Sequence, residues 1–140
     1  MTDRQGEEGV REHDGLQALL AVSEANEPAP RVAADAVKSL SSGGYSEAEV
    51  FELVVPKRTL ARRQARHEPL TVEETDKAVR LARIADLAHR VFGDPDKAHR
   101  WLRKPKRSLN GAPPLAFLAS EAGARMVEQM LHRIDHGMFG

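Results

Sequence analysis

The sequence predicts an all-α protein, and three observations lead to this prediction. Apolar residues recur at spacings of three and four along much of the 140-residue chain, the pattern of helices with one buried face. They are mostly leucine, valine, isoleucine and alanine, because aromatic residues make up only 4% of the sequence. No stretch combines alternating apolar residues with the short turn of a β-hairpin. We therefore expect a small protein built from helices.

The N-terminal region predicts an acidic tail followed by two short helices. Residues 1–15 are rich in glycine and glutamate and poor in apolar groups, so we expect them to be disordered. Residues 16–25 suit a short helix that ends at the prolines of "NEPAP". Residues 32–41 show the spacing of a second helix, which "SSGG" ends.

Two further helices are expected close together in the middle of the chain. Ser46 and Glu49 are spaced as a capping box, which begins a helix over residues 46–53. Pro56 suits the first position of the next helix, residues 56–66.

The C-terminal half predicts a long helix and two shorter ones. Thr71 and Glu74 form a second capping box, for a helix over 71–92 that Gly93 ends. Asp94 and Pro95 begin the next helix as cap and first residue, with Ala98, Trp101 and Leu102 turned inward. After the loop "KPKRSLNGAPP" and one helical turn in "PLAFLA", Ser120 caps a last helix that Gly137 ends. Its expected buried face is Val127, Met130, Leu131 and Ile134.

The charges are balanced in number and uneven in position. The chain has 21 basic and 21 acidic residues, but residues 1–50 carry a net charge of −6 and residues 51–110 one of +7. A basic middle suggests a polyanionic partner for that part. The sequence has no cysteine, no apolar run long enough to span a membrane, and an N-terminus unlike a secretory signal. We therefore expect a protein of the cytoplasm.

The stretch "PKRTLARRQAR" predicts a DNA-binding helix. The two helices 46–53 and 56–66 are separated by only a few residues, as a helix-turn-helix requires. Leu60 would face the core, and arginine can bind a phosphate or grip a guanine. The alternative is an ordinary solvated helix face with an excess of positive charge. The candidate DNA-binding residues are Lys57, Arg58, Thr59, Arg62, Arg63 and Arg66.

A longer ordered pattern occupies the C-terminal half. The segment "FGDPDKAHRWLRKPKRSLNGAPPLAFLASEAGARMVEQMLHRIDHG" combines Phe-Gly-acidic, Trp-Leu, a proline–asparagine–glycine loop, a small-residue helix start and a final apolar helix ending in glycine. In this the chain resembles the Xre/MbcA/ParS antitoxins of RES-type toxin–antitoxin systems. Upstream, "SEAEVFELVVPKRTLARR" resembles the degenerate helix-turn-helix of that family, with Val54 and Val55 at the turn where glycine is usual.

The resemblance implies a domain organisation and a function. It implies a helical dimerisation and helix-turn-helix part over 16–70 and a toxin-binding domain over 71–140, with helix 71–92 linking the two. Antitoxins of this kind dimerise, bind a RES-domain toxin and mask the cleft where it hydrolyses NAD⁺ or transfers ADP-ribose from it. They perform no chemistry, need no cofactor, and in complex with the toxin repress their own operon. The alternative function is a free-standing helix-turn-helix regulator without a toxin partner.

With the resemblance, the expected toxin-binding surface joins a loop to the end of the last helix. Leu115 and Leu118 would bury against the apolar face of that helix, which would bring the loop to the helix end as one exposed ridge. The alternatives are that Phe139 folds back onto its own chain, or that the "RKPKRSLNG" loop is the occluding surface. The candidate residues are Asn110, Gly111, Pro113, Pro114, Arg133, His136, Gly137, Met138 and Phe139.

The spacing of the histidines does not predict a metal or catalytic site. His132 and His136 are four residues apart, but Arg133 stands where a zinc-protease motif needs glutamate, so we expect a solvated helix edge and no metal site. His89 and His99 have no assigned role, and nothing resembles a catalytic triad, which argues against an enzyme.

The helices over 16–25 and 32–41 carry more apolar surface than so short a segment buries alone. We therefore expect a homodimer built mainly from residues 16–60.

Overall fold

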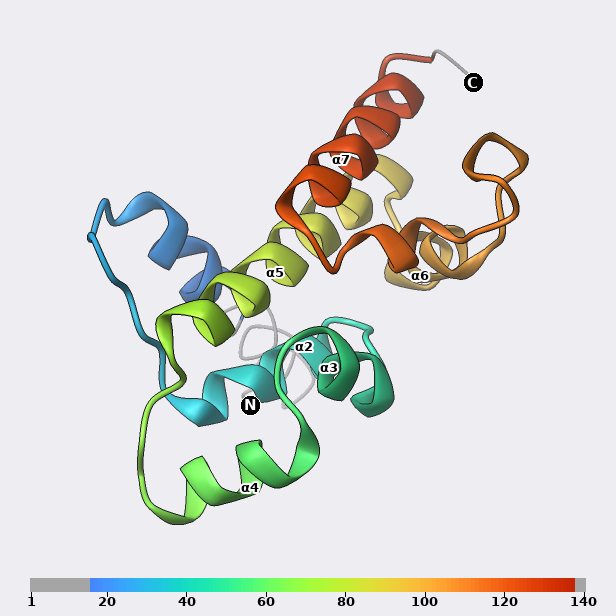
Figure 1. Cartoon of the computed structure of the whole chain (residues 1–140). Helices are drawn as coiled ribbons and strands as arrows, with labels where there is room; N and C mark the ends of the chain where they lie inside the picture. The colour runs from blue at the N-terminus through green and yellow to red at the C-terminus, as the bar shows by residue number, and fades with distance from the viewer. Residues whose placement is uncertain (1–15, 138–140) are drawn as a thin grey trace, which may run out of the picture. The chain divides into compact units, whose positions relative to one another are not determined.

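The computed structural model describes residues 16–137, which form helices joined by short turns (Figure 1). The all-α prediction is confirmed: over these residues the one β-type pairing is an isolated bridge between Ala33 and Pro69. The chain divides into two compact units between Ala82 and Arg83, inside the long helix α5 (Val72–Phe92). The disorder expected for residues 1–15 concerns residues outside those described.

The first unit contains the expected N-terminal helices. Residues 16–24 are helical, and a 3-10 turn η1 (Ala34–Val37) continues directly into α2 (Lys38–Ser42). The helix predicted over 32–41 thus begins two residues late. The reason is that the N–H of Val32 donates to Oγ1 of Thr75 at 3.2 Å while its carbonyl accepts from Leu70 N–H at 2.9 Å. These bonds tie the residue to the segment around the start of α5 and leave it outside the helix.

The next two helices follow their predicted bounds closely. α3 (Glu47–Leu53) begins with the predicted capping box of Ser46 and Glu49, and α4 (Lys57–Ala65) follows after three residues. Pro56 caps α4 and is not its first residue, because its ψ of 148° is extended. Its fixed φ of −59° suits that position as well.

The core of the first unit is aliphatic and closed by one buried tyrosine. The hydroxyl of Tyr45 donates to the carbonyl of Leu81 at 2.7 Å, which fixes the segment before α3 against α5. Four large apolar residues of the N-terminal helices are buried, Leu16, Leu19, Val37 and Leu40, whereas Leu20 and Val22 are only partly covered. Most of this apolar surface is thus covered within the chain, and the homodimer stays a prediction.

The second unit is formed by the end of α5, α6 (Pro95–Arg103), two 3-10 turns and α7 (Glu121–Asp135). The turns are η2 (Arg107–Leu109), which lies in the predicted loop, and η3 (Pro114–Phe117), the predicted single turn. Asp94 caps α6 and Ser120 caps α7, as predicted. Gly93 follows the last residue of α5 with a φ of 68°. Gly137 follows the C-terminal cap residue of α7 with a φ of 77°.

The buried face of α7 is narrower than the sequence pattern suggested. Ala124, Val127 and Leu131 are buried, whereas Met130 and Ile134 are only partly covered. Trp101 is likewise partly exposed and contacts Phe92, with the ring centroids 5.8 Å apart. A stripe at i, i+3 and i+7 is enough to cover one side of a helix, so residues beside it lie at the edge of the core.

Arg83 joins α5 to α7. Its Nε donates to Glu128 at 2.6 Å and its Nη2 donates to Glu121 at 2.7 Å. Burial by itself lowers the pKa of Arg83, but the hydrogen bonds and charges of Glu128 and Glu121 together outweigh it and raise the pKa. The guanidinium is therefore charged at every ordinary pH, and its fork spans both carboxylates.

Gly123 has a structural reason in the first turn of α7. A Cβ at this position would overlap the backbone carbonyl of Phe117, so η3 approaches the helix closely only because the residue is glycine. This explains why the sequence shows a small-residue start to the last helix.

We expect Gly123→Ala to destabilise the protein by about 1–3 kcal/mol, since backbone atoms must move apart. Urea unfolding followed by circular dichroism measures this. Gln129→Ala, at an exposed position of the same helix, is the matched control and should change stability little. Equal stability of the two variants would contradict the close approach.

A second prediction concerns the cap of α5. Burial raises the pKa of Glu74, but the backbone hydrogen bond from Thr71 and the hydrogen bond and charge of Arg63 outweigh it and lower the pKa below its ordinary 4.5. A lowered native pKa contributes stability above 4.5 that disappears as the pH falls through the native value. We expect Glu74→Gln to lose about 1–3 kcal/mol at neutral pH. The loss should shrink on acidification below 4.5, as urea unfolding across pH would show.

The matched control is Glu73→Gln, an exposed carboxylate in the same helical turn. A difference between wild type and Glu74→Gln that stays constant with pH would show that the charge of Glu74 does not contribute.

Candidate functional surfaces

The geometry of α3 and α4 is that of a helix-turn-helix. The turn is closed by backbone bonds, because the N–H groups of Val54 and Val55 both donate to the carbonyl of Val50, at 2.9 and 3.3 Å. Val54 and Val55 are buried, and Leu60 is buried from the first turn of α4. The valines that replace glycine at the turn therefore serve as core residues, and α4 is held by its inner face.

The outer face of α4 is cationic. Arg58, Arg62 and Arg66 follow one another at intervals of four and are exposed, as is Lys57, while Thr59 is half-buried. Within residues 16–137, no ion pair joins these four cations to a carboxylate. Their charges are available to a ligand, which is what a phosphate-binding helix requires.

Arg63 differs from the other candidate DNA-binding cations because its guanidinium is engaged within the fold. Only 14% of its side chain is exposed, its Nε lies 2.8 Å from Oε1 of Glu74, and its Nη2 donates to Oε2 at 3.2 Å. A weaker contact of 3.8 Å joins it to Glu68. Arg63 therefore connects α4 to the capping box of α5 and has a structural role.

The predicted toxin-binding loop is an ordered turn. Lys106 N–H donates to Ala112 at 3.0 Å and Gly111 N–H donates to Lys106 at 2.9 Å, while Leu109 is buried beneath the turn. Asn110 and Gly111 are exposed at its tip with positive φ of 57° and 85°, the left-handed conformation that Asn and Gly adopt most readily.

The prolines after this loop are less accessible than the sequence suggested. Pro113 is half-buried, and Pro114 is buried because it begins η3, which packs against α7. Pro114 is therefore a core residue and not a contact residue.

The end of α7 is exposed, as expected, and no polar contact between described residues joins it to the loop. Arg133, His136 and Gly137 are all exposed, whereas Met138 and Phe139 lie outside the described residues. In Figure 1 the tip of the loop and the C-terminal end of α7 project at separate places. Among the described residues, no hydrogen bond or ion pair joins residues 107–114 to residues 132–137. No polar contact among the described residues therefore links the two, and the single ridge stays a prediction.

Comparison with known proteins matches each unit to a domain. The model described as the antitoxin Xre-like helix-turn-helix domain matches residues 29–83. The model described as the antitoxin Xre/MbcA/ParS C-terminal toxin-binding domain matches residues 87–137. The junction between them falls where the structure divides, just after Ala82.

Three similar proteins are each named antitoxin Xre. The one from Pseudomonas putida is 44% identical over 84 residues, which are 60% of this chain and 53% of that protein. The one from Yersinia enterocolitica is 35% identical over 86 residues, 61% of this chain and 58% of the relative. The one from Photorhabdus laumondii is 30% identical over 125 residues, 88% of this chain and 80% of the relative.

The chain belongs to the Xre antitoxin family. The aligned part spans little more than half the length of the first two relatives and most of the third. The family's helix-turn-helix domain contains α3 and α4, and its toxin-binding domain contains the loop and α7.

A histidine pair inside the toxin-binding domain was not predicted from the sequence. Nε2 of His89 and Nε2 of His99 lie 3.1 Å apart, with the rings edge to face, and His99 is buried. The two residues lie on α5 and α6, so only the packing of these helices shows the pair.

No cluster of metal-ligating side chains and no membrane-spanning helix is found in the part of the chain that the structure describes. No group of three or more metal-ligating side chains occurs in residues 16–137, and His132 and His136 are exposed as expected. None of the helices described is long and apolar enough to cross a bilayer.

For α4 we expect Arg58→Ala, Arg62→Ala and Arg66→Ala together to weaken binding to DNA from upstream of the gene. Each lost phosphate contact lowers the log–log salt slope by roughly 0.9, so the slope should fall by up to about 2.7. Fluorescence anisotropy at several salt concentrations measures it.

Two controls separate DNA contact from fold. Arg63→Ala should lower the melting temperature with little change in slope, because it removes an internal ion pair. Replacing three exposed cations elsewhere, Lys38, Lys77 and Arg125, removes the same charge from other surfaces. If the α4 variant binds DNA as this second control does, α4 is only a solvated face.

Proposed function

We propose that this chain neutralises a cognate RES-domain toxin by covering the toxin's NAD-binding active site. The observation that carries the proposal is the match of residues 87–137 to the family's toxin-binding domain, together with the exposed end of α7 in that range. The proposed partner is a NAD hydrolase or an ADP-ribosyltransferase. The chain itself acts as an inhibitor and performs no reaction.

The end of α7 has the chemistry that such inhibition needs. Arg133 is exposed and offers a planar, always charged fork to carboxylates around a dinucleotide site. Gly137 has a φ of 77°, so the chain leaves the helix there, and His136, Met138 and Phe139 supply bulk. A concave nucleotide pocket can be blocked by bulk alone. The exposed Asn110 and Gly111 form a second, separate candidate contact.

We propose in addition that the chain regulates its own operon through α4. Lys57, Arg58, Arg62 and Arg66 would contact operator phosphates, with Thr59 beside them. A homodimer would place two such helices on a two-fold operator. Sedimentation of the free protein at micromolar concentration tests the dimer, and a monomer would contradict it.

The test of toxin neutralisation uses the variant Arg133→Glu with Phe139→Ala, which leaves the buried face of α7 intact. Coexpressed with a cognate RES-domain toxin, this variant should fail to restore growth, while the wild type protects. Circular dichroism must show an unchanged fold. Arg125→Glu, at an exposed arginine of the same helix, is the matched control and should still protect.

Two outcomes would contradict the proposal at different levels. Full protection by the double variant would move the occluding surface away from the end of α7, first of all to the loop at Asn110 and Gly111. The absence of any toxicity from a neighbouring RES-domain protein would favour the alternative, a free-standing helix-turn-helix regulator.

A further inference from the structure

The toxin-binding domain carries a second concentration of positive charge, distinct from α4. Residues 97–110 contain six basic side chains and no acidic one. We define the α6 basic surface as the five cations on α6 and the loop after it that have no carboxylate partner within residues 16–137: Lys97, Arg100, Lys104, Lys106 and Arg107.

Elsewhere in the second unit, three arginines pair with carboxylates. Arg83 pairs with two glutamates, Arg90 lies 3.2 Å from Asp86, and Arg125 lies 4.0 Å from Glu121. On the α6 basic surface the cations instead act on one another. Burial and then the charge of Lys104 lower the pKa of Lys106. The charge of this surface is therefore not neutralised within the described chain.

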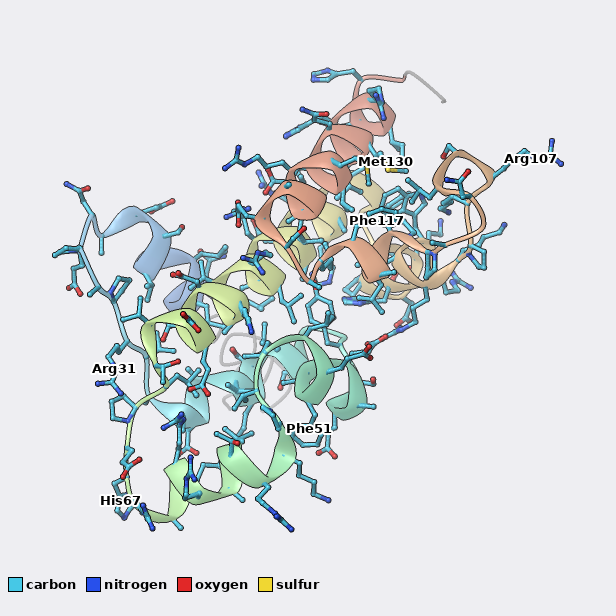
Figure 2. All side chains as sticks on the ribbon, in the orientation of Figure 1. Arg31, Phe51, His67, Arg107, Phe117 and Met130 are labelled. Carbon is cyan, nitrogen blue, oxygen red and sulfur yellow. The ribbon has the colours of Figure 1, made fainter. Side chains whose placement is uncertain are left out.

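The surface is held in place by the fold. The loop is closed by the bonds between Lys106 and Ala112 and between Gly111 and Lys106, and the ammonium of Lys106 lies 5.1 Å from the centroid of the Trp101 ring. Figure 2 shows Arg107 pointing away from the ribbon at the end of this loop. Because the backbone of the loop is already ordered, binding a ligand does not carry the entropy cost of ordering it.

A purely structural explanation accounts for part of this pattern only. Cations near the C-terminus of a helix interact favourably with its dipole, and Arg100 lies in the last turn of α6. Lys106 and Arg107 lie beyond the end of the helix, where that effect has fallen off, and Lys97 lies in its first half.

The mixture of residues favours phosphate over protein as the ligand. Lysine is depleted in the cores of protein interfaces, whereas lysine and arginine together are typical of surfaces that follow a nucleic-acid backbone. Three of the five cations here are lysines. We propose that the α6 basic surface binds the phosphate backbone of duplex DNA without reading its sequence. This proposal does not depend on the role of α4.

The experiment compares four proteins on a labelled duplex of arbitrary sequence, by fluorescence anisotropy between roughly 50 and 200 mM salt. They are the wild type, a surface variant with Arg100→Ala, Lys104→Ala and Arg107→Ala, the α4 variant, and the control with Lys38→Ala, Lys77→Ala and Arg125→Ala. The surface variant spares Lys106, which is partly buried over Trp101. Its log–log salt slope should be lower than that of the control by up to about 2.7.

The outcomes distinguish this proposal from the function of α4 and from a protein ligand. A surface variant that binds the duplex with the same slope as the control overturns the proposal, whatever the α4 variant does. A surface variant that keeps its slope but fails to protect cells from the toxin assigns the surface to a protein partner, and also overturns it. A lowered slope in the surface variant supports it, even if the α4 variant binds normally.

Discussion

The fold depends on one helix whose two halves are buried in different units. Along α5, alanine and larger aliphatic side chains are fully buried on successive turns, first among the residues of the helix-turn-helix domain and then among those of the toxin-binding domain. Glu74 near its start binds Arg63 of α4, and Arg83 in its middle binds the two glutamates of α7. Four of the buried residues of α5 are alanines, whose short side chains let neighbouring residues approach the helix backbone closely. They are Ala78, Ala82, Ala85 and Ala88.

The position of the candidate DNA-binding helix α4 depends on contacts made by its inner side, one of which is to α5. Val54, Val55 and Leu60 fill the core beside the turn, and Arg63 bonds to the cap of α5. With these inner contacts made, Arg58, Arg62 and Arg66 are left on the outside with no carboxylate in reach among the described residues. The two valines at the turn are thus core residues, while the exposed cations lie on the outer face of α4.

Several acidic residues of this neutral chain are engaged by helix caps and by ion pairs within the fold. Glu49 and Glu74 accept from the backbone in capping boxes, and Asp94 caps α6. Glu121 and Glu128 hold Arg83. The exposed cations Lys57, Arg58, Arg62 and Arg66 and those of the α6 basic surface have no such internal partners in residues 16–137. The formal net charge is zero, but the charge offered to a ligand at these two places is positive.

The sequence by itself determined the helices, because their ends depend on local chemistry. The capping boxes at Ser46 and Thr71, the cap at Asp94 and the glycines after α5 and α7 act over a few residues, and the bounds they predicted agree with the structure to within one or two residues. The helix-turn-helix and the outward stripe of α4 follow from the same spacings. The toxin-binding candidates came from an ordered pattern of residue types, and the exposure of Arg133 and His136 agrees with it.

Only the tertiary structure decided which side chains have partners. The spacing of α4 does not reveal the partner of Arg63, because the glutamate that engages Arg63 lies eleven residues away on another helix. The pairing of His89 with His99 and the burial of Pro114 at the start of η3 depend in the same way on how the helices pack. Periodicity indicates which side of a helix is apolar, but contacts between elements determine how much of that side is covered, and so which residues are left for a ligand.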